Sequence, residues 1–188
     1  RAWDDEGSPI GFNINRLKDK LGSKALPTSE ITLSGIPAQL LGEKGKGIKN
    51  ITHMLKLTRL ENSCAAVAAF RRGLALARDY SFRRIAFGES LANQPLHLEA
   101  LANLEIEFTG AFLLTFFLTE LVGKEECNCA TQEETKVLRL LAPLTKLYTG
   151  KQTVIGVSEI VESFGGAGYI EDTDLPRHIR DAQLLPIW

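Results

Sequence analysis

Cysteines are scarce in this sequence, and their arrangement excludes a fold stabilised by disulfides. Only three are present, and two of them, Cys127 and Cys129, are separated by one residue. This set lacks the even, regularly spaced framework of small secreted domains. It also lacks the paired spacing of a zinc site, although His53, His97 and His178 supply further candidate ligands. We therefore expect no bound metal and an intracellular, reducing compartment, either mitochondrial or cytoplasmic.

Neither sign of charge is in excess. The sequence has 22 basic and 23 acidic residues, for a net charge of -1. Despite basic pairs at Arg71 and Arg72 and at Arg83 and Arg84, this balance gives no electrostatic argument for nucleic acid as the main partner. The longest apolar run, residues 110–118, is far shorter than the roughly 20 residues that span a bilayer. We expect neither a nucleic-acid partner nor a membrane span.

The first part of the chain predicts strands. Residues 1–46 are punctuated by glycine, proline and serine and hold two short alternating runs, residues 11–16 and 30–34. Two strands alone are not independently stable, so we expect them to belong to a larger sheet. The sequence begins at Arg1 without a basic and apolar leader. It also lacks an initiator methionine, so the chain is expected to be a fragment of a longer protein.

Helical periodicity replaces this pattern after Gly47. Apolar residues recur at helical spacing from residue 48 to about 80 and from 94 to 122. Thr131 and Glu134 have the spacing of a capping box and predict the start of a third helix, which ends at the next glycine cluster. A short fourth helix is expected over residues 175–185. The chain is thus predicted to be mainly α, with an antiparallel four-helix bundle over residues 47–188 after a β segment in residues 1–46.

A first motif lies between the two long helices. Arg84 is followed by Phe87 and Gly88, and then by Asn93 and Gln94. One interpretation is helix punctuation, because a basic last turn favours the helix dipole and a glycine ends the helix. The other is a ligand site, because the planar and permanently charged guanidinium suits phosphate groups. These residues alone leave both interpretations open.

A second motif closes the third helix. Glu162 is followed by Gly165, Gly166 and Gly168. A helix C-terminus accounts for the first glycine. Three glycines within four residues also let the backbone lie against a ligand, because no Cβ stands in the way.

In their order and spacing, these two motifs and the segment Arg180-Asp181-Ala182 resemble the C-terminal portion of the acyl-CoA dehydrogenases, a family of flavoproteins. The resemblance covers essentially the whole chain. Most members have glutamine where this chain has Glu162. The glutamate, together with the Gly-Tyr pair ending at Tyr169, is most similar to the adaptive-response branch of the family.

This resemblance implies an FAD-dependent acyl-CoA dehydrogenase, in which a glutamate removes the α-proton of an acyl-CoA thioester while the β-hydride passes to the flavin. It implies a homo-oligomer, either a dimer or a dimer of dimers, with an unknown electron acceptor. Residues 1–46 would end the family's middle β-domain, and residues 47–188 would form its C-terminal bundle domain. The implied FAD contacts are Arg84, Ala86, Phe87, Asn93, Gln94, Glu162, Gly165 and Gly166. Of these, Arg84, Phe87 and Gln94 would reach the flavin dinucleotide across a subunit boundary, and Glu162, Gly165 and Gly166 would lie on its adenosine side. The implied acyl-CoA contacts are Lys56, Thr58 and Arg59.

No catalytic base is expected within the chain. In the family the usual glutamate follows the segment that ends here at Trp188. Some relatives carry it instead on the first helix, at the position of Thr58, whose hydroxyl is not a base near neutral pH. We therefore expect the 188-residue chain alone to be inactive. Two alternatives stay open: a flavin-containing protein of the same fold that binds acyl-CoA or nucleic acid without dehydrogenating it, and a helical interaction domain without a cofactor.

Overall fold

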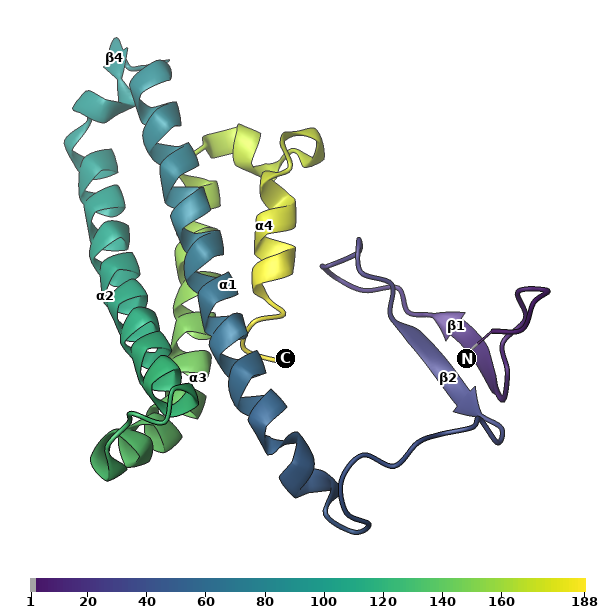
Figure 1. Ribbon diagram of the computed structural model, residues 1–188. Coiled ribbons are helices and arrows are strands. Elements are labelled where there is room, and N and C mark those ends of the chain that lie inside the picture. Colours follow the sequence, from purple (N-terminus) through teal and green to yellow (C-terminus); the bar gives the residue numbers. More distant parts are fainter. Residues whose placement is uncertain (1–2) are drawn as a thin grey trace. The chain divides into compact units, whose positions relative to one another are not determined.

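The protein is described by a computed structural model covering residues 3–188, and it divides into two units at His53 and Met54 (Figure 1). In the first unit, β1 (Phe12–Leu17) pairs antiparallel with β2 (Ser29–Leu33). Ile14 lies opposite Ile31, and a bulge follows it. Both side chains are exposed, because two strands offer no second layer to cover them.

Helices make up the second unit. The long helices are α1 (Gly47–Arg83), which begins in the first unit, α2 (Pro95–Glu126) and α3 (Gln132–Glu162), and the short one is α4 (Leu175–Ala182). A small hairpin of β3 (Ile85–Ala86) and β4 (Glu89–Ser90) joins α1 to α2. Figure 1 shows α4 beside α1 and α3. The predicted helical bundle preceded by a short β segment is confirmed.

The core lies where α1, α2 and α3 meet. Phe70 on α1 is fully buried and stacks edge-on against Phe108 of α2, with ring centroids 5.9 Å apart. Gly156 on α3 makes room for it, because a Cβ there would lie 2.3 Å from the Phe70 ring. The hydroxyl of Thr153 donates a hydrogen bond to the Ala66 carbonyl at 3.0 Å. Such close helix contact fixes the relative register of α1 and α3.

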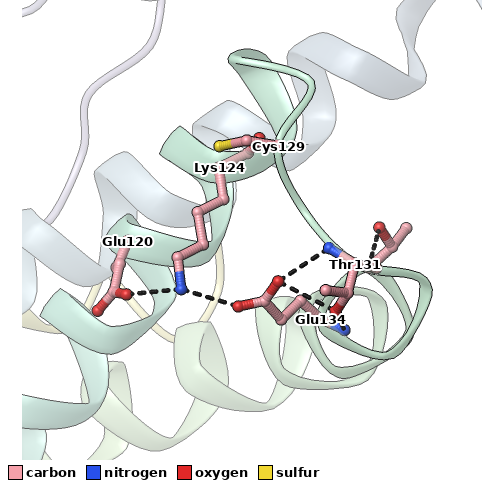
Figure 2. A network of polar contacts seen from close by, with 6 residues as sticks. Glu120, Lys124, Cys129, Thr131 and Glu134 are labelled. Atoms are coloured by element: carbon pink, nitrogen blue, oxygen red, sulfur yellow. Dashed lines mark hydrogen bonds and ion pairs between the residues drawn. The ribbon is translucent and has the colours of Figure 1, made fainter.

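Polar contacts fix the connection between α2 and α3 (Figure 2). The Thr131 hydroxyl accepts a hydrogen bond from the backbone N–H of Glu134, and the Glu134 carboxylate accepts one from the Thr131 N–H, so the predicted capping box is present. The ammonium of Lys124 lies 2.8 Å from carboxylate oxygens of both Glu120 and Glu134. These contacts join the last turns of α2 to the first turn of α3.

One long face of α2 is left uncovered in this unit. The exposed fractions of Ile106, Leu113 and Phe116 are 67%, 62% and 51%. By length and composition alone, α2 could also cross a membrane, and a third of its most apolar window is buried. The sequence-based expectation of no membrane span counted only an uninterrupted apolar run and so did not identify this helix. A core helix of a soluble protein meets the same criterion, so the finding does not by itself place α2 in a bilayer.

Candidate functional site

The hairpin between α1 and α2 carries an aromatic side chain in an unusual conformation. Phe87 and Gly88 form its tip, with φ angles of 56° and 87°. Positive φ at both central residues suits a tight two-residue hairpin but is rare for a bulky aromatic residue. The Phe87 side chain is 96% exposed. Strain held at an exposed aromatic residue is typical of a functional position.

Of the three glycines after α3, the fold requires two, and each for its own reason. Gly165 has a φ of 61°, a conformation that favours glycine. A Cβ on Gly168 would lie 2.0 Å from the carbonyl oxygen of Val161, so only glycine fits there. Gly166 meets neither constraint, because its φ is not positive and a Cβ would find nothing within 4 Å. Its missing side chain leaves open space outside the protein's own packing.

These two motifs meet at one cavity of about 520 Å³, a volume in the range of small-molecule sites. It is lined by Tyr80, Arg84, Ala86, Leu91, His97 and residues 162–167. Five of the predicted FAD contacts therefore lie together, namely Arg84, Ala86, Glu162, Gly165 and Gly166. Phe87, Asn93 and Gln94 do not line this cavity and lie on or next to the connection between α1 and α2.

Polar groups of this cavity are well placed for a phosphate-bearing ligand. The Tyr80 hydroxyl reaches the Phe164 carbonyl at 3.5 Å and ties α1 to the glycine turn. The Nε2 atom of His97 is buried and has no hydrogen-bond partner among residues 3–188. A cationic fork at Arg84, open backbone at Gly166 and an unsatisfied buried nitrogen fit the ADP half of FAD.

A second cavity, of about 500 Å³, lies at the site predicted to bind acyl-CoA. Thr58 and Arg59 line it with Lys146 and Trp188, and with Met54, Leu55 and Pro143. Burial, and then the nearby Arg59 charge, lowers the pKa of Lys146. None of these lining residues is acidic, so the described lining presents only positive charge.

Lys56 is placed elsewhere. Its ammonium pairs with the carboxylates of Glu125 and Glu126 on α2, at 3.1 Å for Glu126. It does not line the cavity of Thr58 and Arg59. Its assignment to acyl-CoA stays a prediction, and the structure gives it a structural partner on α2.

The end of the chain is attached to α3 beside the second cavity. The Lys146 ammonium donates a hydrogen bond to the Pro186 carbonyl at 3.0 Å. One turn further along α3, a Cβ on Gly150 would lie 3.0 Å from backbone atoms of Leu185 and Pro186. The bare helix surface at Gly150 thus lets the C-terminal turn approach closely.

Sequence reasoning missed several lining residues of these cavities, among them three that can form hydrogen bonds or carry charge. Tyr80, His97 and Lys146 carry no local motif, and His97 was weighed only as a metal ligand. In the part of the chain that the structure describes, no three histidine, cysteine or acidic side chains gather as a metal site would require. The available signal for His97 was its spacing: it lies three residues after Gln94, in the first turn of α2.

Proteins similar to this chain occur in a nematode and in a bacterium. Residues 45–188 match the family described as acyl-CoA dehydrogenase, C-terminal domain. The chain is 45% identical over 185 residues to acyl-CoA dehydrogenase family member 11 of Caenorhabditis elegans, which covers 98% of the chain and 30% of that protein. It is 31% identical over 183 residues to the putative acyl-CoA dehydrogenase AidB of Escherichia coli, with coverages of 97% and 33%.

A solved structure matches the entire chain. The crystal structure of Caenorhabditis elegans ACDH-11 in complex with C11-CoA aligns with 100% of the chain at a TM-score of 0.96 and 45% identity. The match covers 32% of that structure's chain. The present chain thus spans about a third of the length of these relatives.

Proposed function

Because the chain belongs to the acyl-CoA dehydrogenase family, we propose that it forms the C-terminal helical region of an FAD-dependent enzyme that dehydrogenates an acyl-CoA thioester between its α and β carbons. The observation that carries this proposal is the first cavity. It unites Arg84 with the glycine turn of Gly165 and Gly166, far away in sequence. The relative solved with C11-CoA supports an acyl-CoA as the substrate class.

In this proposal the first cavity holds the ADP half of the cofactor. The flavin supplies the hydride acceptor when bound. Arg84 binds the pyrophosphate with its planar fork, and Gly166 lets the backbone approach without a Cβ in the way. The exposed ring of Phe87 is free to cover a cofactor held by a neighbouring subunit. The chain's own contribution is to bind and orient.

The second cavity takes the acyl-CoA in this proposal. Arg59 and Lys146 complement the negative charge of the CoA phosphates. Thr58 cannot remove the α-proton, so we propose that a glutamate following Trp188 in the intact gene product is the base. The positive charges of Arg59 and Lys146 account for acyl-CoA binding alone, so the second candidate function is a flavoprotein that binds acyl-CoA without dehydrogenating it.

The visible spectrum of the purified intact gene product tests the proposal. Addition of acyl-CoAs of increasing length should bleach the flavin band, and the most effective length reports the tail that fits. A flavin that binds acyl-CoA without bleaching would establish the second candidate function instead. A colourless protein that binds no added FAD would contradict both candidates. The 188-residue chain alone is the matched control and should give no turnover.

A further inference from the structure

A buried nitrogen atom of His97, in the first cavity, forms no hydrogen bond within the part of the chain that the structure describes. His97 lies in the first turn of α2 and lines the cavity together with Arg84 and Glu162. Its Nε2 is shielded from solvent and has no hydrogen-bond partner within residues 3–188. Leaving such a nitrogen unpaired costs free energy, so native proteins pair nearly all of them with protein, ligand or water.

The surroundings of His97 indicate which kind of partner is missing. Ala86 and Leu91, which lie on the hairpin side of the cavity, have apolar side chains and offer no side-chain hydrogen bond. The glycine turn also lines the cavity, and at Gly166 a side chain would meet no protein atom within 4 Å. Arg84 supplies positive charge to the same cavity. Glu162 adds a negative charge to it. The space beside His97 therefore suits a polar ligand that offers anionic groups to Arg84 and hydrogen-bond donors to Glu162.

We infer that His97 is a ligand-binding residue whose Nε2 hydrogen bonds to the ADP half of FAD. This inference rests on the proposed function. An imidazole nitrogen can donate to a phosphate or ribose oxygen or accept from an adenine amine or ribose hydroxyl, so it matches the polar groups that an ADP moiety offers. The inference adds a third side chain to Arg84 and Glu162.

Three variants of the intact gene product test this assignment. His97→Leu removes the nitrogen at similar volume, and His97→Gln places an amide near the Nε2 position. His53→Leu is the matched control, because His53 is exposed on α1 and does not line the cavity. The measurements are the dissociation constants of the apoprotein for FAD, ADP and riboflavin and its melting temperature without ligand.

Loss of one hydrogen bond should weaken FAD and ADP binding by His97→Leu about tenfold, with partial recovery in His97→Gln. Riboflavin lacks the ADP half, so its affinity should not change. The apo variant should melt at the parent temperature or above it, because an unpaired buried nitrogen has been removed. If His97 had only a structural role, His97→Leu would lower the melting temperature of the apoprotein as well as its affinity for FAD and ADP.

Other outcomes overturn the inference in recognisable ways. Unchanged FAD and ADP affinity in His97→Leu would show that water satisfies the nitrogen and would leave the proposed function intact. An equal loss of FAD and riboflavin affinity would remove the assignment to the ADP half. Failure of the parent itself to bind FAD or ADP would contradict the proposed function together with this inference.

Discussion

At the scale of single residues, the first cavity combines groups that the fold needs with groups that it does not need. Gly168 is required by its contact with the Val161 carbonyl, and Gly165 by its left-handed backbone. Gly166 and the guanidinium of Arg84 satisfy no comparable structural constraint. Substitution of Gly165 or Gly168 should therefore lower the stability of the apoprotein. Substitution of Gly166 or Arg84 should lower ligand affinity and leave that stability unchanged.

Gly166→Ala should separate binding from folding. The added methyl group meets no protein atom within 4 Å, so the melting temperature of the apoprotein should stay at the parent value. FAD retention should fall, because the methyl group occupies space at the cavity. The control Gly168→Ala should lower the melting temperature clearly, because its Cβ would meet the Val161 carbonyl oxygen. Unchanged FAD retention in Gly166→Ala would remove this residue from the site.

Arg84→Lys should distinguish phosphate binding from helix capping. Lysine keeps the positive charge near the end of α1 but loses the bidentate fork. We expect FAD affinity of the intact gene product to fall about tenfold, while helix content and melting of the apo form hardly change. Retention of the parent's FAD occupancy would show that Arg84 only caps the helix.

At the scale of elements, the start of α3 depends on an ionised carboxylate. The hydrogen bond from Lys124, followed by those from Thr131, lowers the pKa of Glu134 from 4.5 to about 2. A carboxylate whose pKa is depressed on folding adds stability above its unfolded pKa and loses it as the pH falls through the folded pKa. The junction of α2 and α3 should therefore weaken on acidification from about pH 4.5 towards pH 2.

Glu134→Gln tests this dependence on pH. The amide cannot ionise, so the parent's melting temperature should fall more steeply between pH 5 and pH 2.5 than that of the variant. At neutral pH the variant should melt slightly lower, because the ion pair and part of the capping box are lost. Parallel melting curves of parent and variant against pH would contradict the assigned pairing.

The elements differ in how far the sequence predicts them. Long helices and the paired strands follow from periodicity, and the start of α3 follows from the capping box at Thr131. The hairpin of β3 and β4 was not predicted, because two-residue strands show no alternation and Phe87 is not a residue that favours positive φ. No local pattern shows that Arg84 and Glu162 share a cavity, since only packing of α1 against the end of α3 brings them together.

At the scale of the whole molecule, the uncovered apolar face of α2 calls for a partner. Ile106, Leu113 and Phe116 are more than half exposed in the chain by itself. Exposed apolar side chains gathered on one face of a helix are typical of protein interfaces. The proposed covering is a second copy of the chain, as the implied homo-oligomer requires.

Phe116→Glu should weaken self-association of the intact gene product. The parent should sediment as a dimer or a dimer of dimers at micromolar concentration, and the charge should shift the equilibrium towards the monomer because it must be desolvated at the contact. Phe116→Leu is the control, since it keeps the apolar surface and should keep the assembly. A parent that is strictly monomeric by light scattering would contradict the prediction.

Because the C-terminal turn is attached to α3, the segment between Gly168 and Pro186 should not accept insertions or deletions. Gly168 is pressed against Val161 at one end of the segment, and Pro186 is held by Lys146 at the other. Between them α4 is anchored by buried Leu175 and Ala182. Side chains on the outer face of this segment can change freely, but one inserted or deleted residue would rotate α4 and pull Trp188 away from the second cavity. The segment should accordingly tolerate changes of composition and not of length.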